Sequence, residues 1–118
     1  MPHMTVEYTA NLSGFNVPAT LLPLNQALVD SGEFNEADIK SRAIRLDDFL
    51  VGTQPAQRAF VHVKLHILSG RSAEQKQALS SRLLQALTAS FQAQAGLSTQ
   101  LCVEVLEIDR PSYSKAVC

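Results

Sequence analysis

Pro2 is the residue of this sequence with the most distinctive chemistry. Once Met1 is removed, Pro2 becomes the N-terminal residue and its nitrogen becomes a secondary amine. A terminal α-amine has a pKa near ~8, and desolvation or nearby cations lower that pKa toward neutrality, where a general base works well. While Met1 is attached, the same nitrogen belongs to an amide and takes up no proton. The simpler interpretation is that Pro2 only begins an edge strand.

Arg71 is another residue whose position suggests chemistry. It follows Ser69-Gly70 at the end of an expected strand and directly precedes an expected helix. A guanidinium group binds a carboxylate through two hydrogen bonds, and the free amides of a helix N-terminus also favour an anion. The alternative is a solvated arginine in a turn. If the two halves of the chain run antiparallel at the centre of the sheet, Arg71 and Pro2 share one pocket.

The histidines and cysteines do not form a motif that binds metal. His62 and His66 lie four residues apart on one strand face, which favours hydrogen bonding at an interface over metal binding. Cys102 lies in an apolar run and Cys118 ends the chain, so we expect a buried thiol and a free tail thiol. No metal site and no cofactor are predicted.

Four segments show the alternation or the short apolar runs that are typical of strands: residues 2–9, 39–51, 59–68 and 101–108. The alternation within 39–51 breaks at Asp47-Asp48, where a bulge is expected. The clearest strand is 59–68. Its apolar face carries Val61, Val63, Leu65 and Ile67, and its other face carries Phe60, His62, Lys64 and His66.

Two segments show helical spacing of leucines, over residues 17–31 and 72–95. Asn16 can cap the first helix, and Pro23 predicts a kink or a later start. Ser72 and Gln75 form a capping box for the other helix, and Gly96 is expected to end it. The tail after Pro111 has no pattern.

The order of these elements predicts an α+β fold within a single domain, 1–118. Two consecutive β-α-β units, 2–51 and 59–108, form a four-stranded sheet with both helices on one face, followed by a tail, 109–118. The face that the helices leave uncovered is too polar to form a hydrophobic core. It is also too rich in long and aromatic side chains to be an ordinary solvent-exposed surface. A ring of subunits packing sheet toward sheet would use it.

Composition narrows the class of protein. The 118 residues carry a formal net charge of −1, which argues against nucleic-acid binding. No apolar stretch is long enough to span a bilayer, and the N-terminus lacks the pattern of a secretory signal, so a cytoplasmic location is expected.

Two sequence features resemble the tautomerase superfamily: the Met1-Pro2-His3 start that runs into a strand, and the stretch 63–76 with its Gly-Arg-Ser turn. The stretch 63–76 resembles the opening of the small 4-oxalocrotonate tautomerases, whose chains begin with the catalytic proline. In this chain the corresponding start of the second half falls near Val61, which cannot act as a base. The chain is most similar to the branch of the 5-carboxymethyl-2-hydroxymuconate isomerases. That similarity covers about residues 2–108 and rests on Pro2-His3, Val6-Glu7, 39–42, 60–62 and 70–72.

The resemblance implies an isomerase of aromatic-compound catabolism, such as homoprotocatechuate degradation. It would convert an unsaturated 2-hydroxy (enol) polycarboxylate such as 5-carboxymethyl-2-hydroxymuconate to its conjugated keto form, with Pro2 as general base. It also implies a homotrimer with helices outside and sheets inside, a small-molecule di- or tricarboxylate substrate, and no cofactor.

The resemblance also suggests which residues bind the substrate. Arg71 would hold one carboxylate, and another cation is expected near the start of the strand 39–51, from the same or a neighbouring subunit: Lys40 or Arg42, with Arg45 behind them. The branch tends to carry arginine where Lys40 stands, and lysine keeps the charge but loses the planar fork. His3 and Phe49 would shape the pocket, although plain packing explains them equally well.

Two other functions stay open. The same scaffold and proline base also serve decarboxylation, hydration or dehalogenation of an unsaturated acid. A non-catalytic, ferredoxin-like module that binds a small molecule has a related count of strands and helices.

Overall fold

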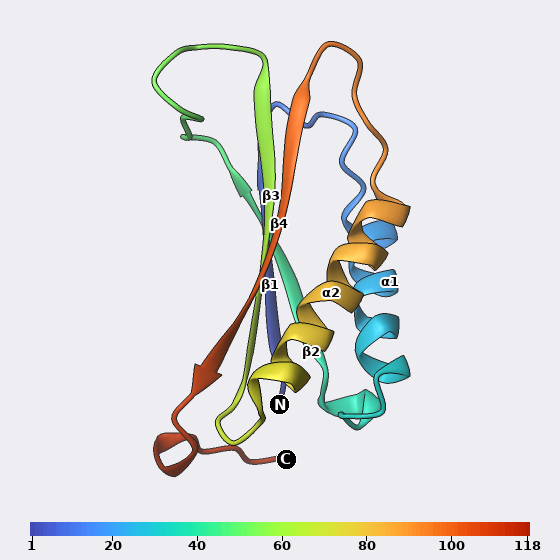
Figure 1. Ribbon diagram of the computed structural model, residues 1–118, viewed down its shortest axis with the longest axis vertical. Coiled ribbons are helices and arrows are strands. Elements are labelled where there is room, and N and C mark those ends of the chain that lie inside the picture. The colour runs from blue at the N-terminus through green and yellow to red at the C-terminus, as the bar shows by residue number, and fades with distance from the viewer.

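A computed structural model describes residues 1–118 as one mixed sheet with two helices (Figure 1). The elements are β1 (His3–Thr9), α1 (Val17–Asp30), a 3-10 turn (Glu36–Asp38), β2 (Lys40–Leu46), β3 (Arg58–Leu68), α2 (Ala73–Ser90), β4 (Ser98–Ile108) and a last 3-10 turn (Arg110–Ser112). The strand order is β2-β1-β3-β4. β1 runs parallel to β2 and antiparallel to β3, and β3 runs parallel to β4. The predicted α+β fold of two β-α-β units is confirmed.

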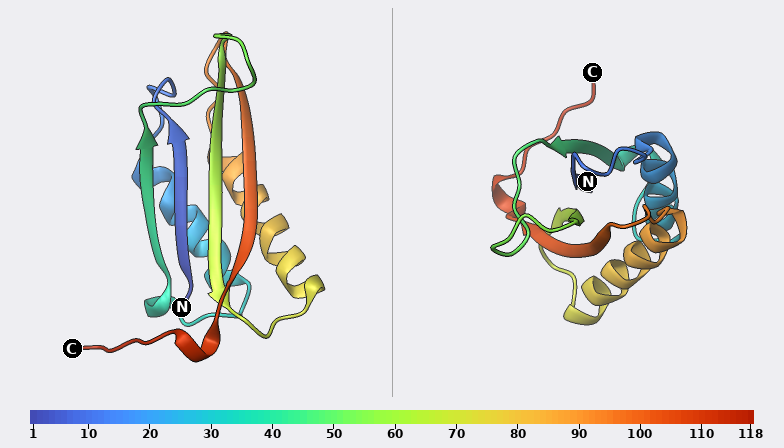
Figure 2. Two further views of the ribbon diagram at one scale, coloured as in Figure 1. Left: turned by 90° about the vertical axis from the view of Figure 1, so that its left-hand side faces the viewer. Right: turned by 90° about the horizontal axis from the view of Figure 1, so that it is seen from above.

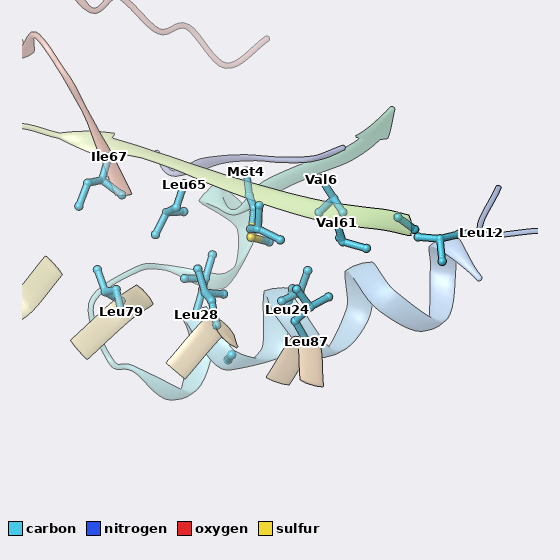
Figure 3. Packing of buried hydrophobic residues seen from close by; sticks show 14 residues of the cluster. Met4, Val6, Leu12, Leu24, Leu28, Val61, Leu65, Ile67, Leu79 and Leu87 are labelled. Atoms are coloured by element: carbon cyan, nitrogen blue, oxygen red, sulfur yellow. The ribbon is translucent and has the colours of Figure 1, made fainter. Parts of the chain in front are cut away.

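Both helices cover the same face of the sheet (Figures 1 and 2). Residues of β3 alternate between buried and half-buried along its whole length, and Val61, Val63, Leu65 and Ile67 are fully buried as predicted. They pack with apolar residues of β1 and the two helices in one core (Figure 3). Each Å² of apolar surface removed from water stabilises the fold by about 25 cal/mol, so this layer is the main source of stability. The opposite face, which we call the open face, has no covering element within the chain.

The helices begin where the sequence predicts. The Asn16 side chain accepts a hydrogen bond from the Ala19 amide at 3.1 Å, and Ser72 and Gln75 form the expected capping box. α1 does not start late, because it runs from Val17 with Pro23 inside it. Pro23 lacks the amide that would bond to the Ala19 carbonyl, and Ala19 is exposed, so water can satisfy that carbonyl.

Two predicted boundaries were wrong. The strand expected over 39–51 does not reach residue 51 through a bulge, because β2 is an edge strand whose sole neighbour, β1, ends at Thr9 opposite Leu46. α2 ends at Ser90 rather than near residue 95, because Phe91 turns to an extended conformation and packs against the core. Gly96, with φ of +76°, serves the turn into β4 instead.

Cys102 corrects another expectation. It lies on the open face of the edge strand β4 and is exposed rather than buried. Cys118 is a free thiol at the end of the tail, as predicted.

Candidate active site

Pro2 lies at the end of the sheet where β1 and β2 begin and β3 and β4 finish, which we call the Pro2 end. The residue is buried, and its carbonyl accepts a hydrogen bond from the Lys40 amide at 3.2 Å. His3 lies in register with Lys40 of β2 and with His66 of β3. Since β1 and β3 run antiparallel, the end of β3 and the start of β1 meet here, which is the arrangement that the shared pocket of Arg71 and Pro2 requires.

The terminal amine of the chain, that of Met1, lies at this end of the sheet. Its pKa lies below the ordinary value of 8.0, first because burial removes water from the charged form, and then because Lys40 and Lys115 place positive charge nearby. Asp38 opposes the shift through its negative charge. The Lys40 ammonium also donates to the main-chain carbonyl of Asp38, which holds it beside the amine.

His3 lies next to the amine on the open face. Its Nε2 atom is 3.1 Å from the Tyr113 hydroxyl, and the two rings meet edge to face at 6.0 Å between centroids. The pKa of His3 is lowered from 6.5, mainly by burial and then by the charges of Lys40 and Arg42. The imidazole is therefore neutral at neutral pH.

The end of the chain crosses the Pro2 end of the sheet, from β4 past the N-terminus toward β2 (Figure 2, left). We call residues 110–115 the C-terminal strap. The Arg110 guanidinium donates twice to the Ser69 carbonyl, at 3.0 and 3.2 Å, and the Lys115 ammonium donates to the Asp38 carboxylate at 2.6 Å. This pairing lowers the pKa of Asp38 and raises that of Lys115.

Arg71 has partners of its own within the chain. Its guanidinium donates to the side chain of Glu33 at 3.1 Å and to the main chain of Glu33 at 3.3 Å, and it stacks over the Phe34 ring at 4.7 Å from the centroid. A guanidinium has five N–H donors, so some stay available for another acceptor. Arg71 thus fastens the start of α2 to the segment that follows α1.

Of the remaining predicted residues, Arg42 lies near His3, whereas Arg45 and Phe49 lie far from it within one chain. Arg42 is exposed on the open face, opposite Thr5, close enough to affect the pKa of His3. Arg45 pairs with Asp47 toward the other end of β2, ~17 Å from Lys40 at ~3.3 Å per residue. Phe49 lies in the connection beyond it. The structure therefore gathers His3, Lys40 and Arg42 near Pro2, but not Arg45 or Phe49.

Two clefts of the chain, of about 350 and 380 Å³, lie away from Pro2. The smaller lies between the start of α1 and the residues after α2, and the larger lies on the open face beside Phe60 and Cys102. Neither contains a residue of the predicted site. No group of three His, Cys, Asp or Glu side chains is arranged to hold a metal ion. Neither helix has the length and apolar composition needed to cross a membrane.

Sequence reasoning missed three residues at the Pro2 end: Asp38, Tyr113 and Lys115. The tail has no periodicity, and the contacts of Tyr113 and Lys115 span 110 and 77 residues of sequence. The one available signal was the presence of an aromatic and a basic residue in a tail otherwise without pattern.

Taken together, the Pro2 end combines an amine of lowered pKa, two ammonium groups and a neutral imidazole. An amine of lowered pKa accepts protons near neutral pH, and the cations attract an anionic substrate. The fold that presents this site is found in solved tautomerases. A fused 4-OT, solved as a symmetric trimer, is 24% identical with a TM-score of 0.74, covering 97% of this chain and 91% of that chain. The chain thus has the tautomerase fold.

Sequence comparisons narrow this class to one family. The family model of the 5-carboxymethyl-2-hydroxymuconate isomerases matches residues 2–117, and the chain belongs to that family. The 5-carboxymethyl-2-hydroxymuconate Delta-isomerase of Escherichia coli is 31% identical over 94 residues, 79% of this chain and 75% of that protein. The crystal structure of a 5-carboxymethyl-2-hydroxymuconate isomerase from Deinococcus radiodurans R1 is 34% identical, with a TM-score of 0.87, covering 98% of this chain and 88% of that chain. The protein is therefore an isomerase of the tautomerase type.

Proposed function

We propose that the protein converts an unsaturated 2-hydroxy polycarboxylate, such as 5-carboxymethyl-2-hydroxymuconate, to its conjugated keto form, with Pro2 as the general base. The observation that carries the proposal is the lowered pKa of the Met1 amine, which lies just before β1 and feels the charges of Lys40 and Lys115. Removal of Met1 would free the Pro2 nitrogen as a new terminal amine, and Pro2 is itself buried with its carbonyl bonded to the Lys40 amide. The family names of the similar isomerases agree with this substrate class.

In this reaction the Pro2 nitrogen takes the proton of the enol hydroxyl group, or acts on the dienolate. The oxygen then forms the ketone, the double bonds shift, and a proton is returned to a carbon of the former diene. No atom is gained or lost, so neither an oxidant nor a reductant is needed. A positioned general base contributes about 10²- to 10⁴-fold to such a proton transfer.

The cations at the Pro2 end would hold the carboxylates of the substrate. Lys40 and Arg42 lie beside His3 on β2, and Arg71 has N–H donors beyond those that bind Glu33. His3, neutral and turned toward Tyr113, would shape the pocket. Arg45 and Phe49 would act only in the site of a neighbouring subunit, because they lie at the far end of β2.

We further infer a homotrimer that packs its open faces around an axis and works in the cytoplasm in the catabolism of aromatic compounds. The support for assembly is the open face itself, which carries half-buried polar and aromatic side chains and is left uncovered within the chain. A solved structure of the same fold is a symmetric trimer.

The test is a panel of unsaturated acids offered to the purified protein. Ketonisation of 5-carboxymethyl-2-hydroxymuconate, followed by ultraviolet absorbance, is expected to exceed every competing reaction. Those competitors are carbon dioxide release from malonate semialdehyde, chloride release from 3-chloroacrylate, and hydration of an acetylenic acid. Faster turnover of a competitor would contradict the proposal, and no turnover at all would favour a binding module.

A further inference from the structure

The C-terminal strap brings the cation Lys115 to the Pro2 end. Neither the sequence pattern nor the register of the strands predicts that Lys115 lies there. Arg110 ties the strap to the end of β3, Tyr113 ties it to β1 through His3, and Lys115 ties it to Asp38 before β2. The backbone of the strap runs across this end of the sheet (Figure 2, left). The strap therefore has a defined path, and Lys115 a defined place.

The charges around the amine explain why this place matters. A substrate with two or three carboxylates needs more than one cation beside the base. Arg71 is already paired with Glu33, with both side chains largely shielded at 21% and 23% exposure. Lys40 donates to a main-chain carbonyl, so its charge is free of a carboxylate partner. Lys115 is the next cation whose charge reaches the amine.

We propose that Lys115 is a substrate-binding residue of the Pro2 site, which binds a substrate carboxylate in place of the Asp38 carboxylate. The inference rests on the proposed function in that it takes the substrate to be a polycarboxylate. The Lys115–Asp38 pair is open to exchange, because the two side chains are 38% and 34% exposed. An exposed pair gains little from its contact, so an incoming carboxylate displaces Asp38 at small cost.

Because Arg110 and Tyr113 hold the strap in place, this exchange requires only the Lys115 side chain to move. They hold the strap backbone on either side of Ser112 while the Lys115 ammonium turns from Asp38 to the ligand. Asp38 then acts as a competitor for the ammonium group. Removal of Lys115 and removal of the Asp38 charge should therefore have opposite effects on ligand affinity. A bridge that only stabilises the fold would make the two variants alike.

The experiment measures binding of propane-1,2,3-tricarboxylate, a saturated triacid that cannot tautomerise, by calorimetry. It compares wild type, Lys115→Gln, Lys115→Arg and Asp38→Asn. We expect Lys115→Gln to weaken binding about tenfold, the scale of one charge-assisted hydrogen bond. Lys115→Arg should retain most of the affinity, and Asp38→Asn should tighten binding severalfold. Lys76→Gln is the matched control, because Lys76 pairs with Glu107 between α2 and β4, two strands away from β1.

The same four proteins are assayed for ketonisation, so that the two proposals can fail separately. Lys115-dependent binding without turnover in the wild type would contradict the proposed function and leave the role of Lys115 intact. Turnover with equal triacid affinity in Lys115→Gln and Asp38→Asn would overturn the role of Lys115 and leave the function intact. No binding of the triacid by the wild type would also overturn the inference.

Discussion

The reactivity of a terminal amine depends on which charges surround it. At this N-terminus, burial is the largest cause of the lowered pKa, and Lys40 adds both a hydrogen bond and a repulsive charge. The backbone places Lys40 there, since its amide bonds to the Pro2 carbonyl at 3.2 Å. In the proposed mechanism, a lysine at this position would lower the pKa of the base as well as attract the substrate.

The pH dependence of catalysis follows from this arrangement. The Pro2 amine would lie beside the same cations that lower the pKa of the Met1 amine below 8.0, and a base works when deprotonated. The rate constant kcat/KM should therefore rise with pH to a plateau, with a midpoint below 8.0. Lys40→Met removes a cation that disfavours the protonated amine, so the midpoint should move to higher pH. Profiles of kcat/KM against pH for the two proteins measure the shift. Lys76→Met is the control and should leave the midpoint unchanged. A midpoint that also stays unchanged in Lys40→Met would show that Lys40 does not act on the amine.

At the scale of single elements, α2 offers a matched pair of leucines. Leu83 is fully buried against the sheet, and Leu84 beside it is 40% exposed. Leu83→Ala should lower the free energy of unfolding by about 2–5 kcal/mol through the lost contacts and the cavity, whereas Leu84→Ala should cost under about 1 kcal/mol. Urea unfolding at one protein concentration measures both. Equal losses would mean that the outer face of α2 is also covered.

The elements differ in how far the sequence could predict them. The strict alternation of β3 and the capping box of α2 depend on neighbours in the sequence, and both were predicted correctly. The end of β2 depends on the length of β1, and the end of α2 depends on packing of Phe91, so local patterns missed them. Pro2 and Lys40 could be proposed from the sequence. Lys115 could not, because its partner Asp38 is 77 residues away.

At the scale of the whole molecule, the open face carries a row of acidic and basic side chains. Lys64 lies 3.1 Å from Glu7, and the His62 ring lies 2.6 Å from Glu104. Acidic and basic groups thus alternate across β1, β3 and β4. Partly exposed pairs of this kind contribute little in a monomer, but they set register and partner choice when an interface buries them.

A charge reversal on this face tests the proposed assembly. Lys64→Glu places like charges beside Glu7, which costs several kcal/mol when buried at an interface. Sedimentation should show the wild type at three times the mass of one chain and Lys64→Glu as smaller species. Arg82→Glu, a charge reversal at an exposed position of α2, should stay trimeric. A trimer in all three proteins would mean that the open face is not the interface.

The proposed mechanism depends above all on the Pro2 amine acting as the base. The most direct measurement is the ketonisation rate of 5-carboxymethyl-2-hydroxymuconate by wild type and Pro2→Ala, each shown by intact mass to lack Met1. The proline mechanism predicts a fall in kcat of about 10²-fold or more in the variant, the range lost with a general base. Equal rates in the two proteins would contradict it and assign the proton transfer to another group at the Pro2 end.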